Sequence, residues 1–383
     1  MVLPAARLGE RLRVNKKLIP FSFWPTKNGP KGNASLQSML FSLDPWAIIN
    51  QSIKSSCPAA ARAEALACMD QARDFFEGAM DAQRVSARPL ALYYCFMNLV
   101  KAFCLTRGVQ QTFDKAQHGL TEVLRAPGNR ELTDAFLRAF VSPNGTGILQ
   151  NFSEFMSVLT GAGLVASQEF DVPILLPQVL PGHRLWSSAA NKKERFVAIH
   201  DIRPYLCKTT RELWLNLYFV SDDLSRIGAT IKRFLAESKL GPMFVQVTCA
   251  ETENSSRELI CFQQVTPIVC PNKKYANSLQ SLFDSIRGFL WATVSSVPPY
   301  RRHYVYLRPV AEDQQTVPQL LSIYMLAYYF GSITRYRPHH FPAINAGLFG
   351  PRVQDFISGQ PQQFLYLLAS EFARREIAKP SII

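Results

Sequence analysis

The feature that most constrains the fold is a pair of segments that are too apolar to lie in water. Residues 90–105 place apolar side chains on every face of the helix that their pattern predicts, which is typical of a helix at the centre of a domain. Residues 320–333 are similarly apolar, and the polar uncharged residues around them favour a buried helix over a membrane span. We therefore expect the two helices to pack together and to join the first and last thirds of the chain into one helical body.

The segments around these helices carry recognisable start and stop signals. Three helix starts are predicted in the first third of the chain, at Asp44-Pro45, at Pro58 and at Arg88-Pro89. In the last third, Thr316 precedes a helix that Pro338 ends, and Pro351 and Pro361 each lie just inside a final helix.

The middle of the chain has the pattern of strands. β-branched and aromatic residues predict strands at residues 195–206, 212–220, 243–249 and 258–265. Helices are expected at residues 222–238 and 275–290, followed by a strand through residues 304–307. Hairpin-like and helix-crossover connections both occur, so we expect a mixed sheet. The predicted fold class is α+β, with a mixed-sheet α/β region inserted into a helical body.

The charge of the chain suggests how it is organised. The 383 residues carry a net charge of +13, and the basic excess lies in the first 32 residues and in the middle third. We expect a basic arm at residues 1–32, an N-terminal helical region at 33–165, the mixed α/β region at 166–310 and a C-terminal helical region at 311–383 that packs on the N-terminal one. The positive charge also makes an anionic partner worth considering.

Composition and motifs exclude several classes of protein. Hydrophobic residues at 48% and charged residues at 19% exclude a disordered or fibrous chain. The eight cysteines form no CxxC pair and mostly lie in apolar runs, which is typical of small buried side chains in a reducing compartment. The start of the chain lacks the apolar run of a secretory signal, and no phosphate-cradling, hydrolase or metalloprotease motif occurs. We expect a cytoplasmic protein without a membrane span, a cofactor or a metal.

One cluster, at the end of the second apolar helix, is a candidate catalytic site. Arg335 and His340 have the arginine-x4-histidine spacing of metal-independent RNases, in which the pair polarises and protonates around a scissile phosphate. Arg337 and His339 would then hold phosphate. The alternative is that the arginines cap the helix C-terminus, where the helix dipole favours positive charge. Composition alone produces such a spacing about once in a chain like this.

Basic residues next to aromatic ones are candidate nucleic-acid contacts, because they combine phosphate neutralisation with base stacking. The basic candidates are Arg301 and Arg302, which lie among the tyrosines of a predicted strand, and Lys192 and Lys193, which precede the first strand. The aromatic candidates are Phe21, Phe23 and Trp24, which follow the basic arm. The alternative is that side chains along the strand point alternately into the protein and into solvent, and that the basic arm is only a terminal tail.

Three polar residues on or near the first apolar helix are further candidates. Lys101 lies on an otherwise apolar helix, so its ammonium must reach water or meet a carboxylate, for which Glu122 and Glu154 are conceivable. His118 precedes a glycine in a polar connection, where the plainer interpretation is a capping or hydrogen-bonded loop histidine. The alternative is that contact between the two apolar helices brings His118 and Arg335 into a common pocket. Asn98 is expected to be mostly structural.

Two stretches of the chain resemble a known family. RPLALYYCFMNLVKA at residues 88–102, followed by HGL at 118–120, is similar to the hallmark of the YaaC-like family of bacterial proteins. YMLAYYFGSITRYRP at residues 324–338 resembles that family's second block, and DPW at 44–46 resembles its opening. The resemblance covers residues 40–378 and implies a shared fold and a bacterial cytosolic origin, but no established activity.

The Tyr-Tyr helix followed by a short loop and His-Gly also resembles the core helices of HEPN proteins, a group that includes RNase toxins and non-catalytic subunits of defence systems. We expect a non-metabolic protein that binds nucleic acid or a partner protein, or forms a homo-oligomer, as a subunit of an antiviral defence system. The alternatives are a HEPN-type endoribonuclease that uses Arg335 and His340, and a pure structural scaffold. Whether the chain is an enzyme is therefore left open.

Overall fold

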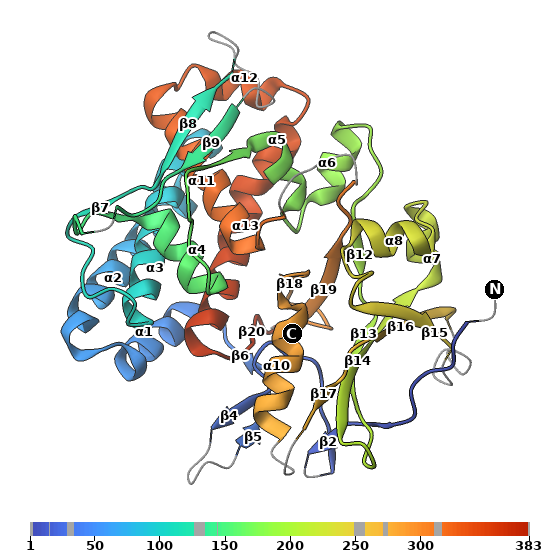
Figure 1. Cartoon of the computed structure of the whole chain (residues 1–383). Helices are drawn as coiled ribbons and strands as arrows, with labels where there is room; N and C mark the ends of the chain where they lie inside the picture. Colours follow the sequence, from blue (N-terminus) through green and yellow to red (C-terminus); the bar gives the residue numbers. More distant parts are fainter. Residues whose placement is uncertain are drawn as a thin grey trace. The chain divides into compact units, whose positions relative to one another are not determined.

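The computed structural model describes residues 3–14, 16–28, 34–125, 135–143, 145–248, 257–270, 275–309 and 316–381. The chain forms two compact units. The helical unit comprises Leu43–Lys192 and Val317–Ala373, and the sheet unit comprises Met1–Ser42, Lys193–Thr316 and Arg374–Ile383. The α+β class is confirmed, because the first and last thirds of the chain share a helical body and the sheet-rich middle is inserted between them in the sequence (Figure 1).

The helical unit begins at the predicted helix starts. α1 (Pro45–Ser56), α2 (Ala59–Asp81) and α3 (Arg88–Thr106) follow one another, with a short 3-10 helix η2 (Val85–Ala87) before α3. Asp44 caps α1, since its Oδ1 accepts hydrogen bonds from the backbone N–H groups of Trp46 (3.0 Å) and Ala47 (3.3 Å). This cap and the proline at the first helical position explain why the helix begins there.

The two apolar helices pack together as expected. α11 (Gln319–Tyr336) lies against α3 (Figure 1). The ring of Tyr93 packs edge-on against those of Tyr324 and Tyr328, with ring centres 5.9 and 5.1 Å apart. At Gly331 a Cβ atom would lie 2.9 Å from the Cβ of Tyr93 and 3.3 Å from the carbonyl oxygen of Pro89. A residue without a side chain is therefore what lets the two helices approach at this point.

The rest of the helical unit combines further helices with two small sheets. The helices are α4 (Asn151–Thr160), α5 (Val172–Leu175), η4 (Leu176–Gln178), α6 (His183–Ala189), α12 (His340–Ala346) and α13 (Gly350–Ala373). The strands β8 (Leu120–Leu124), β9 (Ala135–Ala139) and β11 (Gln168–Asp171) form an antiparallel sheet, and β7 (Ala116–Gln117) pairs in parallel with β10 (Leu149–Gln150). The sequence did not predict these strands. Pro361, expected near a helix start, lies inside α13.

The central position of α3 explains its apolar composition. Among the described residues, the stretch Val85–Thr106 is long and apolar enough to cross a membrane, but 78% of its most apolar window is buried inside the protein. Besides α11, the helices α2, α4 and α13 contact α3. A helix packed on all sides needs apolar residues on all faces, so this composition alone is weak support for a membrane span.

The larger sheet of the sheet unit has the strand order β1-β13-β14-β16-β15. Its strands are β1 (Glu10–Arg11), β13 (Asp201–Leu206), β14 (Glu212–Val220), β15 (Phe244–Val247) and β16 (Leu259–Gln264), with β17 (Ile268–Val269) paired to β14. These ladders are antiparallel. Within the described residues, the parallel pairing in this sheet is a bridge between Ala5 and Thr248, beside β15. The expected mixture of strand directions is therefore confined to an edge.

Two predicted elements are each divided into two. The single strand expected at residues 195–206 is wrong: β12 (Phe196–Ala198) joins a second antiparallel sheet with β19 (Arg301–Tyr306) and β18 (Leu290–Val294), whereas β13 belongs to the larger sheet. The chain changes sheet where Ile199 N–H donates to the carbonyl of His303 and His200 N–H donates to that of Tyr218. The single helix expected at residues 222–238 is α7 (Ser221–Arg226) and α8 (Ile231–Glu237), separated by a turn at Gly228.

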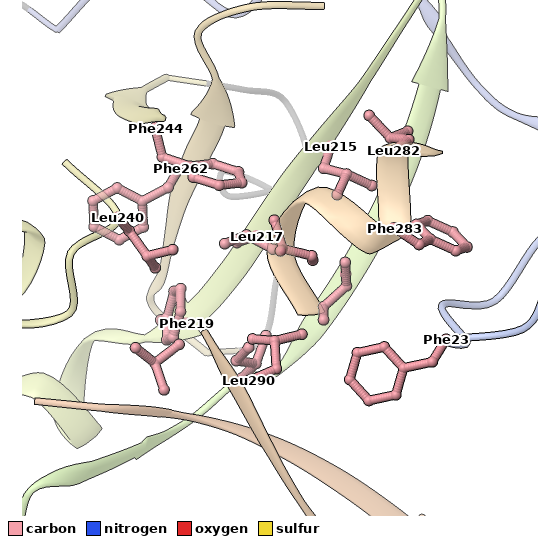
Figure 2. Packing of buried hydrophobic residues seen from close by; sticks show 14 of the residues in the cluster. Phe23, Leu215, Leu217, Phe219, Leu240, Phe244, Phe262, Leu282, Phe283 and Leu290 are labelled. Carbon is pink, nitrogen blue, oxygen red and sulfur yellow. The ribbon is translucent and has the colours of Figure 1, made fainter. Parts of the chain in front are cut away.

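The core of the sheet unit lies between the larger sheet and α10 (Tyr275–Arg287). Leu215, Leu217 and Phe219 alternate along β14, so their side chains share one face of the sheet. Figure 2 shows these residues together with Leu282 and Phe283, which α10 contributes to the same cluster. All five side chains are fully buried, so the contact between helix and sheet holds this unit together.

The N-terminal segment, expected as a basic arm, is built into the sheet unit. It forms β1, a hairpin of β2 (Arg13–Val14) and β3 (Lys17–Leu18), and the pair β4 (Thr26–Asn28) and β5 (Ala34–Leu36); β6 (Leu40–Phe41) pairs in parallel with β20 (Ile377–Ala378). Leu12, Ile19, Phe23 and Trp24 are buried in the core, so the two aromatic residues do not provide exposed surfaces for base stacking. The guanidinium of Arg287 instead lies 4.8 Å from the ring of Trp24.

The close contact at Gly331 predicts an unusual response to alanine. Alanine in place of glycine inside a helix normally stabilises a protein by about 1 kcal/mol. Gly359→Ala in α13 should show this gain, because no atom lies within 4 Å of the added Cβ. Gly331→Ala should instead lower the free energy of unfolding by about 1–3 kcal/mol, since α3 must shift to admit the methyl group. Urea denaturation measures both values, and equal stabilisation by the two substitutions would contradict the packing described.

Candidate anion-binding site at His118

His118 lies in a tight connection between β7 and β8, beside the start of α4. Gly119 follows it with a φ of +78°, and a Cβ atom at Gly119 would lie 2.9 Å from the backbone nitrogen of Phe152. That same nitrogen donates a hydrogen bond to the carbonyl oxygen of His118 (3.3 Å). The turn therefore requires a glycine after the histidine, and it holds the backbone of His118 in place.

The imidazole of His118 is oriented by Tyr93 of α3. The Tyr93 hydroxyl and His118 Nδ1 lie 2.6 Å apart. Tyr93 is buried, and burial together with the neighbouring Tyr324 raises its pKa well above the usual value, so the hydroxyl keeps its proton. This hydroxyl also has the thioether of Met97 at 3.8 Å and the hydroxyl of Tyr324 near it, and both are weaker acceptors than an imidazole nitrogen. We infer that Tyr93 donates to Nδ1, which leaves the ring proton on Nε2.

Two positive side chains act on this imidazole. The pKa of His118 lies below its ordinary value, first because the ring is partly buried and then because of Arg335 and Lys101. Arg335 comes from the end of α11 and Lys101 from the middle of α3, so each apolar helix contributes one of the two charges. His118 is therefore a neutral imidazole near pH 7, and one cation from each helix acts on it.

Neither cation is neutralised by a carboxylate in the described part of the chain. Arg335 is exposed, and its Nη1 donates to the uncharged hydroxyl of Tyr94 (2.7 Å). Lys101 is half-buried and has neither a hydrogen bond nor an ion pair with any described residue. The carboxylates expected for Lys101 have other partners. Glu122 pairs with Arg337, and Glu154 accepts hydrogen bonds from Gln110 (2.8 Å) and Ser142 (2.6 Å).

Arg337 forms a separate ion pair at the edge of the site. Its Nη1 donates to Oε1 of Glu122, whose side chain is only 3% exposed. Burial raises the pKa of Glu122, while Ser332 and Arg337 oppose that rise. Burial, and then the charge of Glu122, raise the pKa of Tyr328 to about 12. Because its charge is balanced by Glu122, Arg337 adds no net charge to the site, and holding phosphate would require this pair to open.

The structure gives Arg335 and His340 different surroundings. His340 begins α12, is 7% exposed, and its ring lies 4.5 Å from that of the exposed His339. Arg335 donates to the hydroxyl of Tyr94 on α3, and its charge lowers the pKa of His118. Arg335 therefore acts on His118, an imidazole that lies far from it in the sequence. The His-Gly pair and the two apolar helices were visible in the sequence, but their meeting depends on tertiary packing.

The other candidate residues are spread over both units. Asn98 is buried and its Nδ2 donates to Gln71 (2.8 Å), which fits the structural role expected for it. Lys192 is exposed in the helical unit, and Lys193 is exposed in the sheet unit. Neither shares a described contact with His118.

Arg301 and Arg302 follow the alternative considered for their strand, in which successive side chains point into the protein and into solvent in turn. Arg302 is exposed, but Arg301 is only 6% exposed and its Nη1 donates to the carbonyl of Ile377 (3.0 Å). Arg301 also affects the pKa values of two buried groups. Burial, and then the charge of Arg301, lower the pKa of His303 to about 3. Burial raises the pKa of Glu376, and Arg301 opposes that rise. The expectation that Arg301 belongs to a nucleic-acid surface is therefore wrong, because its charge lies inside the sheet unit.

Five of the seven described cysteines are buried, as expected of small apolar side chains, whereas Cys68 and Cys207 are partly exposed. Those that the structure describes carry free thiols, and Cys95 and Cys104 are fully buried with pKa values raised by burial. Cys249 lies outside the described residues. Within residues whose placement is described, no three His, Cys, Asp or Glu side chains come together as metal ligands.

Comparison with known proteins places the chain in a family. No curated protein and no solved structure matches it. The family described as YaaC-like Protein matches residues 33–372, which is nearly the whole chain and includes both apolar helices and the His-Gly pair. The protein therefore belongs to the YaaC-like family.

Proposed function

We propose that the protein binds nucleic acid through phosphate contacts at the His118 site. The observation that carries the proposal is the pair of positive charges, Lys101 and Arg335, that act on His118 without a neutralising carboxylate among the described residues. An ammonium, a guanidinium and a neutral imidazole N–H are all donors suited to phosphate oxygens. An unbalanced positive site on a half-exposed surface favours an anion that supplies the missing charge.

Two further features support a polymeric phosphate as the ligand. The chain as a whole carries +13, which strengthens association with a polyanion. The half-buried ring of Tyr94, whose hydroxyl meets Arg335, lies at the same site and is stacked on Phe75, so it is held in place beside the cations. The proposal places the protein in the bacterial cytoplasm as a non-metabolic subunit of an antiviral defence system, where nucleic acid is the target. Support for that setting is the lack of cofactor and metabolic-enzyme motifs in the sequence.

Nucleic-acid binding should weaken when the two charges are removed. Fluorescence anisotropy with labelled single-stranded RNA, single-stranded DNA and duplex DNA at low and moderate salt measures the dissociation constants. The double variant Lys101→Met, Arg335→Gln should bind at least about tenfold more weakly, because each charge-assisted contact to phosphate is worth about 1.5–3 kcal/mol. Its affinity should also fall less steeply with salt, since fewer counterions are released.

The matched control for this experiment is Arg73→Gln. Arg73 is an exposed arginine of α2 in the same unit, and its charge is already paired with Glu77 at 2.8 Å. The control should bind as the unaltered protein does. An absence of binding to all three nucleic acids even at low salt would favour the scaffold function, and an equal loss in the control would show that the site has no special role.

A second function, endoribonuclease activity, is favoured by the orientation of His118. A neutral imidazole held by Tyr93 beside two cations has the parts needed to transfer a proton next to a phosphate. For this function we propose Arg335 with His118 as the catalytic pair, as an alternative to the Arg335–His340 pair of the sequence.

An RNA cleavage assay separates the two assignments. If the protein is a nuclease, His118→Ala should remove at least about 99% of the cleavage rate, because positioned acid–base groups contribute about 10²–10⁴-fold. His340→Ala should retain cleavage in any variant that keeps its thermal stability. Loss of cleavage in a folded His340→Ala protein would instead restore the assignment based on sequence spacing.

A further inference from the structure

The sheet unit contains a basic pocket that has no part in the His118 site. It has a volume of about 400 Å³ and lies where β1 meets the hairpin between β13 and β14. Its charged lining consists of Arg11, Arg13, Lys208 and Arg211, with Glu10 as the single acid. The remaining lining residues are two leucines, so the pocket has no aromatic ring.

The charges that line this pocket are not balanced. Glu10 and Lys208 neutralise each other, with Oε2 and Nζ 2.6 Å apart. The remaining three are guanidinium groups. Arg13 donates to the backbone carbonyl of Lys16 (3.2 Å), and the side chain of Arg11 has no hydrogen bond or ion pair with any residue that the structure describes. The pocket therefore has a net positive charge that its own residues leave uncompensated.

Arg211 supplies a second, independent observation that points to an anionic ligand. Its Nη2 is inaccessible to solvent, yet it has no hydrogen-bond partner in the described part of the chain. The backbone of Arg211 is held on both sides, because its N–H donates to the carbonyl of Cys207 (2.8 Å) and its carbonyl accepts from Cys270 N–H (2.9 Å). Leaving a guanidinium nitrogen unpaired out of water is unfavourable, and the negative charge of an anion bound beside the guanidinium in the pocket would offset part of that cost.

We propose that this pocket binds a small polyphosphate, as inorganic pyrophosphate or as the phosphate chain of a nucleotide. Planar guanidinium groups match phosphate oxygens with paired hydrogen bonds, and three of them suit a ligand with at least two phosphate groups. The volume is within the range of small-ligand sites. Because the lining offers no ring for a base to stack on, recognition is through the phosphates, and a nucleoside diphosphate binds about as tightly as pyrophosphate.

The experiment is a calorimetric titration of the full-length protein with pyrophosphate, a nucleoside diphosphate and orthophosphate. The unaltered protein should bind the first two with similar affinity and orthophosphate at least about tenfold more weakly, because orthophosphate reaches fewer guanidinium groups. The double variant Arg11→Gln, Arg211→Gln should lose at least about tenfold in affinity for pyrophosphate. Arg302→Gln is the control, since it removes an exposed arginine of the same unit that does not line the pocket.

Thermal unfolding guards against a variant that simply fails to fold. Arg211→Gln removes an unpaired buried donor, so the melting temperature without ligand should be unchanged or higher, while the increase produced by pyrophosphate should disappear. The proposal is overturned if the unaltered protein does not bind pyrophosphate or if Arg302→Gln weakens binding as much as the double variant. It is also overturned if a single-stranded RNA displaces pyrophosphate and needs Arg11 and Arg211 for its own binding, because the pocket would then serve a polymer. RNA binding that depends on Lys101 and Arg335 alone leaves the two sites independent.

Discussion

The contact between α3 and α11 is the interaction on which the helical unit and its candidate site depend. Two helices that are apolar on nearly all faces bury each other, and the glycine at position 331 lets their backbones approach beside Tyr93. The consequence is chemical as well as structural. Through this contact Arg335 of α11 acts on the same imidazole as Lys101 of α3, that of His118, a residue from a third segment of the chain. None of these segments forms the site alone.

Paired and unpaired charges have different consequences for ligand binding in this protein. Several of the described arginines meet a carboxylate, as Arg337 meets Glu122 and Arg73 meets Glu77. Such pairs balance their own charge and add little to ligand binding. Lys101 and Arg335 in one unit, and Arg11 and Arg211 in the other, lack a carboxylate among the described residues. Both sites follow from the same physical argument, that an unbalanced charge held by a rigid fold favours an anion.

The sequence predicted most elements whose signals are local. The cap at Asp44 and the two apolar helices could be read from the sequence because capping and helical periodicity act within a few residues. The strands β8, β9 and β11 were missed because they are short and are defined by pairing rather than by composition. The same holds for the change of sheet at Ile199, since a continuous strand pattern does not reveal which partner each half pairs with.

The site was predictable only in part. The sequence drew attention to Lys101, His118 and Arg335, and it predicted that the helix contact would bring the His118 and Arg335 neighbourhoods into one pocket. It nevertheless assigned the chemistry to Arg335 with His340, because spacing is the relation that a sequence shows. In the structure, Arg335 donates a hydrogen bond across the helix contact to Tyr94, and its charge lowers the pKa of His118. Phe23, Trp24 and Arg301 were misplaced for a similar reason, because a basic or aromatic run does not show which side chains turn into the core.

The most direct test is the pKa of His118, measured by NMR on the histidine ring resonances and assigned with His118→Ala. The account predicts a pKa below the ordinary value of about 6.5 in the unaltered protein. Lys101→Met should raise it, because removing a nearby cation favours the imidazolium, although burial should keep it below the ordinary value. Lys54→Met, which removes an exposed lysine of α1, should leave it unchanged. An ordinary pKa that does not respond to Lys101→Met would show that the charge of Lys101 does not act on His118, and the proposed site would not exist.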